Sequence, residues 1–205
     1  MMRPSEAGFV ARLLTAWMDL RVSMRSILDS EPGEGRILMF AMTHGVIVFA
    51  AYVLGVAAEA APLPGDDMRL DAKVAAGFTA YIILRPLLLY AIAAGFRLAL
   101  KGFGGTASWR ESRAAVCWAA VVSAPVSFVL ALPGIFALVP GSVVMALDAI
   151  AASFFVVALS YFITEANGLR RVWPVFLVVG GATMGVFGAV YAGSASAMPV
   201  FGDSL

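Results

Sequence analysis

Long apolar runs alternate with short polar stretches along this chain. Five runs are each about twenty residues long and hold few charges; they are Ile37 to Ala58, Val74 to Phe96, Ala114 to Leu138, Val143 to Thr164, and Val172 to about Ala192. A helix rises about 1.5 Å per residue, so each run is long enough to cross a hydrocarbon layer about 30 Å thick. The pattern predicts an all-α, polytopic membrane protein with five transmembrane helices.

Two details refine the third run. Pro125 and Pro133 interrupt it, and proline lacks the backbone N–H and clashes with the preceding turn, so we expect a kink or an early end there. Only residues 139–142 join the third run to the fourth. Because these residues include Pro140 and Gly141, a turn signal, the two helices should form a tight antiparallel hairpin.

A helical periodicity also precedes the first long run. Apolar side chains recur every three or four residues, while most charges fall elsewhere on the helix; the apolar set is Phe9, Leu13, Trp17, Leu20, Met24 and Ile27. This predicts an amphipathic helix, which either lies on the membrane surface or packs against the cytoplasmic ends of the bundle. Residues 1–36 are therefore expected to form this helix and a connector, 37–192 the transmembrane domain, and 193–205 a short external tail.

Composition agrees with the pattern. Hydrophobic residues make up 61% of the chain and charged residues 13%, against roughly half and a quarter in soluble domains. With a mean hydropathy of +0.92, an ordinary soluble protein is excluded. The net charge of +1 gives no global attraction to nucleic acid.

The distribution of charge predicts the topology. Lys and Arg concentrate in short cytoplasmic loops of membrane proteins. Eleven of the 14 positive residues fall on one side of a five-span arrangement: Arg3, Arg12, Arg21, Arg25, Arg36, Arg97, Lys101, Arg110, Arg113, Arg170 and Arg171. The opposite side holds Arg69 and Lys73, diluted by four acidic residues, and Arg85 lies within a span. We expect a cytoplasmic N-terminus and an external C-terminus.

Ionisable residues inside the predicted spans are the first candidates for function, because burying them in a bilayer is costly. They are His44, Arg85 and Asp148. One hypothesis places Arg85 and Asp148 in an ion pair, with His44 nearby, along a proton or anion path. The alternative is that Arg85 and Asp148 neutralise each other structurally while His44 bonds a neighbouring backbone group.

Two further groups suggest contacts. The fifth run carries small residues at a spacing of four, Gly181, Gly185, Ala189 and Gly193, which favours close packing against a helix of this chain or of a second copy. Glu165, Asn167, Arg170 and Arg171 gather where the fourth run ends. They are candidates for contact with a lipid headgroup or a protein partner, and a solvated loop explains them at least as well.

Several kinds of chemistry are disfavoured. The chain has one histidine and one cysteine, so it contains no zinc set and no His-Glu-x-x-His motif, and it lacks the Gly-x-Ser-x-Gly of serine hydrolases. Cys117 lies in an apolar run and is interpreted as a packing residue. We therefore expect no metal, no cofactor and no catalytic residues.

Two stretches resemble the Yip1 family of five-span membrane proteins. One is GGTASWRESRAAVCWAAVVSAPV, Gly104 to Val126, with a glycine-rich loop leading into a span that contains Ala-Pro. The other is FFVVALSYFITEANGLRRVWPVF, Phe154 to Phe176, where a span ends in an acidic residue followed by a small-residue turn. The resemblance covers nearly the whole chain. The segment before the first span is short and lacks the tyrosine-glycine-proline motifs of eukaryotic members, so their GTPase binding is not expected here.

The resemblance implies a non-enzymatic membrane protein that organises membranes or acts as a scaffold through lipids and protein partners, with self-association possible. Arg outnumbers Lys by twelve to two, which is compatible with a bacterial chain and points to the inner membrane. A small transporter or channel component using Arg85, Asp148 and His44 is the alternative. A lipid-modifying enzyme with a site at Glu165, Asn167 and Arg170 is a more distant one.

Overall fold

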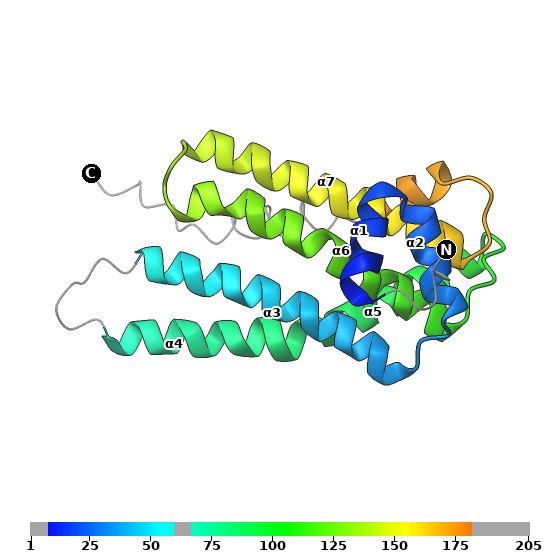
Figure 1. Ribbon diagram of the computed structural model, residues 1–205, viewed down its shortest axis with the longest axis horizontal. Coiled ribbons are helices and arrows are strands. Elements are labelled where there is room, and N and C mark those ends of the chain that lie inside the picture. The colour runs from blue at the N-terminus through cyan, green and yellow to red at the C-terminus, as the bar shows by residue number, and fades with distance from the viewer. Residues whose placement is uncertain (1–7, 60–66, 182–205) are drawn as a thin grey trace, which may run out of the picture.

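The computed structural model describes residues 8–59 and 67–181, and in these two segments the chain forms only helices, turns and short connections. Figure 1 shows the helices running side by side as an elongated bundle. Their bounds are α1 Phe9–Met18, α2 Leu20–Asp29, α3 Glu34–Glu59, α4 Asp67–Phe78, the π-helical segment η2 Thr79–Leu84, α5 Arg85–Lys101, α6 Trp109–Ile135 and α7 Gly141–Ala166. A further helical stretch covers residues 173–181.

Four continuous helices in the described segments are long and apolar enough to cross a bilayer: Glu34–Ala58, Leu70–Lys101, Trp109–Ile135 and Gly141–Ala166. They correspond to the first four predicted spans. Of the fifth, only 173–181 belongs to the described residues, and 182–192 lies outside them. The all-α class is confirmed, whereas the count of five spans stays a prediction.

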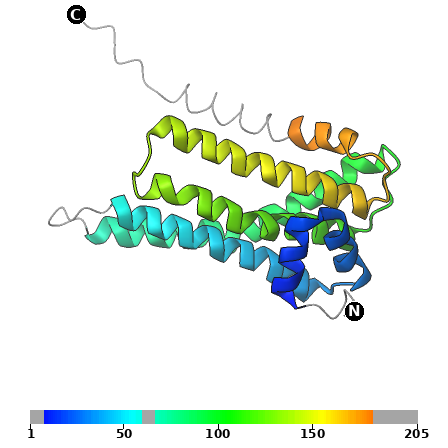
Figure 2. The same cartoon turned by 45° about the horizontal axis from the view of Figure 1, so that its top comes forward.

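Most of the positively charged residues gather at one end of the helical bundle. One end of the bundle, here called the basic end, carries α1, α2, the start of α3, and the loops around 102–108 and 167–172 (Figures 1 and 2). Six of the cations predicted to lie on one side of the membrane belong to these segments, and four more belong to the adjoining ends of α5 and α6: Arg97, Lys101, Arg110 and Arg113. Arg3 lies outside the described residues. The opposite end, here called the hairpin end, holds the Phe136–Pro140 turn, where α6 passes antiparallel into α7 as the Pro-Gly pair predicts.

The N-terminal amphipathic segment forms two helices where the periodicity predicts one. Asp19 interrupts it in an extended conformation (φ −149°, ψ 103°), and its carboxylate accepts hydrogen bonds from the backbone N–H groups of Arg21 and Val22 at 2.9 and 3.0 Å. Asp19 is thus the N-cap of α2, a position that aspartate favours. The apolar period continues across the break, which is why the pattern alone does not reveal it.

Helix α6 forms the centre of the basic half. From Ala114 to Ala124 every side chain is buried, and α1, α2, α3, α5 and α7 all contact this helix. Five of these eleven positions are alanine, and small side chains let neighbouring backbones approach closely. A capping box of Ser108 and Glu111 starts the helix, which runs through Pro125 and ends soon after Pro133.

The second long helix changes its winding beside α3. Pro86 has no N–H to donate, and the preceding turn widens into η2, where the Arg85 N–H bonds the Ala80 carbonyl five residues back. Gly45 of α3 crosses η2 at this point, because a β-carbon on Gly45 would lie 2.4 Å from the Tyr81 carbonyl oxygen. Only glycine permits this approach, and it brings the neighbouring His44 to Arg85.

Candidate functional site

His44 and Arg85 form a polar contact inside the bundle. The Nε–H of Arg85 donates to Nε2 of His44 at 2.8 Å, and Nδ1 of His44 lies 2.9 Å from the carbonyl oxygen of Ala120 in α6. The His44 side chain is buried, and the Arg85 guanidinium also lies 5.8 Å from the centre of the Tyr81 ring. One imidazole therefore links α3, α5 and α6.

The partners determine how the imidazole is protonated. A backbone carbonyl can only accept, so Nδ1 of His44 carries the proton that it donates to Ala120. The Arg85 Nε–H can only donate, so Nε2 must be unprotonated. His44 is thus a neutral acceptor that orients a charged guanidinium, which differs from an acid–base pair poised to exchange a proton.

Asp148 lies apart from this contact. It is exposed on α7, and α6 lies between α7 and α5, which do not touch each other. Asp148 instead faces a groove of about 650 Å³ between α7 and the 173–181 helix, lined mainly by apolar side chains and by Gly180 and Gly181. Of the three ionisable candidates inside the predicted spans, the structure brings together His44 and Arg85 only.

At the basic end, α1 presents a large apolar surface. Several of its apolar side chains are exposed by 46 to 89%: Val10, Leu14, Trp17 and Met18. Its neighbour α2 instead buries Met24 and Ile27 completely against the bundle. Packing against the bundle is therefore confirmed for α2, whereas the exposed face of α1 leaves its contact with a membrane surface a prediction.

Polar anchors fix α1 and α2 on the bundle. The indole N–H of Trp17 donates to the Val122 carbonyl at 3.0 Å, and that of the buried Trp118 donates to Ser23 Oγ at 3.0 Å. The Phe9 ring meets Trp118 edge-on with ring centres 5.9 Å apart, and Phe40 also packs on Trp118. Because α1 is attached at Val122, it lies beside the middle of α6.

Of the polar residues at the end of α7, two are bonded within the fold and two are exposed. Asn167 is buried: its Oδ1 accepts from the Ala107 N–H at 3.3 Å and its Nδ2 donates to the Ile163 carbonyl at 2.8 Å. Glu165 pairs with Arg25 of α2, and this hydrogen bond raises the pKa of the Arg25 guanidinium. Both therefore stabilise the fold, whereas Arg170 and Arg171 are exposed.

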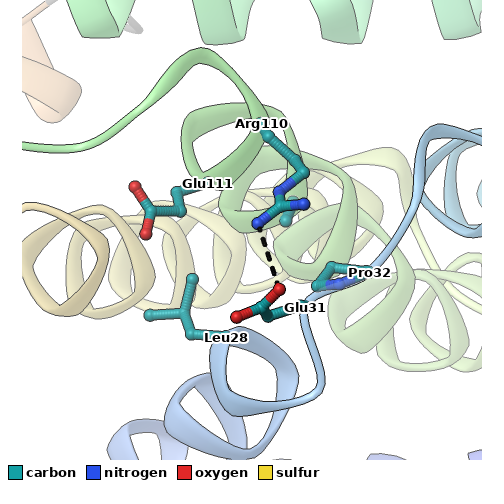
Figure 3. Close-up of a pocket in the computed structure, with 6 residues that line it drawn as sticks. Leu28, Glu31, Pro32, Arg110 and Glu111 are labelled. Carbon is teal, nitrogen blue, oxygen red and sulfur yellow. Dashed lines mark ion pairs between the residues drawn. The ribbon is translucent and has the colours of Figure 1, made fainter.

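A small pocket opens where the α2–α3 connector meets the start of α6. Figure 3 shows Glu31 and Arg110 approaching across it, 3.8 Å apart, with Leu28 and Pro32 beside them. The pocket measures about 100 Å³, and both charged side chains are largely exposed. An exposed pair of this kind contributes little stability, and the pocket is too small for more than a few water molecules.

The remaining candidates are Cys117 and the small residues of the fifth run. Cys117 is buried among the alanines of α6. In the described segments no group of three or more His, Cys, Asp or Glu side chains is placed to hold a metal ion. Gly181 has open space around its Cα, and Gly185, Ala189 and Gly193 lie outside the described residues.

Comparison of the chain with protein-family models, curated proteins and solved structures gives no match in any of the three. The features of the chain that can indicate its function are the geometry of the basic end and the His44–Arg85 contact.

Proposed function

We propose that this chain is a non-enzymatic, five-span inner-membrane protein of Yip1-like type that organises the bilayer through the wedge formed by α1 and α2. The N-terminus and the basic end would face the cytoplasm. The observation that carries the proposal is the exposed apolar surface of α1, held across the bundle at the level of Val122. Solvent-exposed apolar surface of this kind is typical of a site that meets lipid or a partner.

The depth of α1 fits the interfacial region of one leaflet. Val122 is the middle residue of the 27-residue α6, so it lies about 20 Å from the hairpin end. A hydrocarbon layer about 30 Å thick measured from that end extends about 10 Å beyond Val122 toward the basic end. Interfacial helices bury their apolar face about 5–10 Å into this boundary, so lipid chains would cover Leu14 and Met18.

Such a helix gives the bundle an asymmetric cross-section. Among the described residues, the hairpin half contains only the long helices, whereas α1 and α2 add two helices, each about 10 Å across, at the basic end. A protein that is wider in one leaflet favours bilayers in which that leaflet is convex. This is the physical sense in which the chain would organise membranes.

The transporter alternative receives less support. A path using Arg85 and Asp148 together requires both side chains to face one space, and α6 lies between their helices. His44 is also committed to the Ala120 carbonyl and to Arg85. The lipid-modifying alternative loses support because Asn167 and Glu165 are bonded within the fold.

The proposal is tested by the orientation of the protein in vesicles of different size. Cys117 is replaced by Ala, Arg171→Cys is labelled with a fluorophore, and a membrane-impermeant quencher reports which molecules have the basic end outside. In small vesicles, whose outer leaflet is strongly convex, most molecules should show the basic end outside. In large vesicles the two orientations should be closer to equal.

Matched variants isolate the wedge. Leu14→Ser with Met18→Ser removes apolar surface from α1, and Leu138→Ser with Met145→Ser removes two comparably exposed side chains, 73% and 74%, near the hairpin end. The first pair should abolish the preference for small vesicles, and the second should keep it. Equal orientation of the unsubstituted protein in small and large vesicles would contradict the proposed function.

A further inference from the structure

Two arginines converge on one serine hydroxyl at the basic end. Nη1 of Arg12, from α1, lies 3.3 Å from Ser30 Oγ, and Nη1 of Arg36, from the first turn of α3, lies 3.2 Å from the same oxygen. The Ser30 hydroxyl donates its own proton to the Ile27 carbonyl at 2.7 Å. The serine oxygen is thereby left as an acceptor shared by two guanidinium groups.

This arrangement concentrates positive charge on a neutral oxygen. Arg12 is 5% exposed, and burial together with the charge of Arg36 lowers the pKa of its guanidinium. Two carboxylates nearby pair with arginines of α6: Glu31 with Arg110 and Glu34 with Arg113. Guanidinium groups that converge in this way match the oxygens of a phosphate, which accepts several charge-assisted hydrogen bonds at once.

The level of the cluster agrees with a lipid headgroup. Arg36 precedes Ala58, the far end of the first apolar helix, by about 33 Å of helix, just beyond a hydrocarbon layer of about 30 Å. On the face of α1 opposite Arg12, Val10 and Leu14 are exposed by 65% and 48%, so lipid chains can cover this helix while its arginine faces the cluster. The acyl chains of a lipid hold its phosphate at this level, whereas a free phosphate ion would use only the guanidinium groups.

We propose that Arg12, Ser30 and Arg36 bind the phosphate group of an anionic phospholipid in the leaflet that contains α1. This site differs from the exposed arginines at the end of α7, which the sequence offers as candidates for contact with a lipid headgroup. It rests on the proposed insertion of the chain with its basic end at a membrane surface. Bound lipid would join α1, the end of α2 and the start of α3, and so hold the wedge in place.

The site is tested with the full-length protein in detergent micelles. Native mass spectrometry with added phosphatidylglycerol, and with phosphatidylcholine as reference, measures the preference for the anionic lipid. Arg36→Gln should lower that preference about tenfold, the effect of losing one charge-assisted hydrogen bond. Arg36→Lys keeps the charge and should lose less. Arg171→Gln removes the same charge from an exposed position at the same end and should leave the preference unchanged.

The possible outcomes distinguish a lipid phosphate from a free phosphate ion, and they test the lipid site separately from the proposed wedge. If inorganic phosphate alone raises the melting temperature as much as phosphatidylglycerol does, the ligand is a free anion and the lipid assignment is wrong. Equal losses for Arg36→Gln and Arg171→Gln would reduce the effect to general surface charge. A melting temperature is recorded for every variant to show whether it is folded. If Arg36→Gln is not folded, Arg36→Lys is used in its place. If the protein prefers the anionic lipid but its orientation does not depend on vesicle curvature, only the wedge is refuted. If its orientation depends on curvature but it has no lipid preference, only this site is refuted.

Discussion

The contact between His44 and Arg85 can be separated into its two hydrogen bonds by substitution. Asn at position 44 places an amide N–H near the position of Nδ1, so His44→Asn keeps the donor for the Ala120 carbonyl and loses the acceptor for Arg85. Gln at position 44 reaches about as far as Nε2 and offers Arg85 an acceptor. His44→Leu removes both hydrogen bonds while keeping the side chain bulky.

The expected magnitude follows from the charge on Arg85. Hydrogen bonds between helices in membranes average about 0.6 kcal/mol and reach about 1.7, and bonds to charged groups contribute about 1.5–3 kcal/mol. His44→Asn should therefore lower the free energy of unfolding by about 2 kcal/mol, roughly a thirtyfold change in the unfolding equilibrium. His44→Leu should lower it by about 3 kcal/mol, and His44→Gln by less than about 1 kcal/mol.

Unfolding is measured by circular dichroism as sodium dodecyl sulfate is added to protein in dodecyl maltoside micelles. A double-mutant cycle with Arg85→Leu isolates the contact, and its coupling energy should be about 2 kcal/mol. Two results would refute the reasoning: His44→Asn as stable as the unsubstituted protein, or His44→Leu and Arg85→Leu effects that simply add.

Three further predictions use the same unfolding assay. Arg85→Ala and Asp148→Ala should have effects that add within about 0.5 kcal/mol, because α6 lies between their helices; a larger coupling would show that they interact. Gly45→Ala should destabilise by about 1–3 kcal/mol, because its β-carbon would lie 2.4 Å from the Tyr81 carbonyl oxygen, whereas Gly95→Ala, with open space around it, should be neutral or slightly stabilising. Asn167→Ala should cost about 1–3 kcal/mol and speed hydrogen exchange at the Ala107 amide, which loses its acceptor; unchanged exchange would contradict that role.

Hydropathy predicts the first four long helices because their length and lack of charge are local properties of the sequence. The Pro140–Gly141 turn and the placement of cations at one end follow from equally local signals. The bounds differ by several residues where polar side chains extend a helix beyond its apolar run. One example is α6, which begins at Trp109 because Ser108 and Glu111 form a capping box.

The partners of the polar side chains could not be predicted in the same way. The depths of Arg85 and Asp148 along their helices suggest that the two side chains can meet. The sequence does not show, however, that α6 lies between the two helices. The hydrogen bond from Arg85 to His44 depends on the approach of Gly45 to the widened turn before Pro86. The glycine beside the histidine and the proline after the arginine are both visible in the sequence. They indicate the contact only once the crossing of the two helices is known.

Asn167 shows a related difficulty. Next to Arg170 and Arg171 at the end of an apolar run, it looks like part of a polar surface, but the 102–108 loop covers it. Gly105 permits this contact, since a β-carbon there would lie 2.4 Å from Asn167 Oδ1. Contacts between segments some sixty residues apart leave no periodic trace in the sequence.

The position of α1 is the central claim, and site-directed spin labelling measures it directly. With Cys117 replaced by Ala, a nitroxide is placed at Met18→Cys, the most exposed apolar position of α1, in protein reconstituted into phospholipid vesicles. A nitroxide at Arg170→Cys in the exposed loop serves as the aqueous reference. We predict that relaxation at position 18 responds strongly to oxygen, which concentrates in lipid, and weakly to a water-soluble nickel complex. A response to the nickel complex as strong as that at position 170 would place α1 in water and contradict the account.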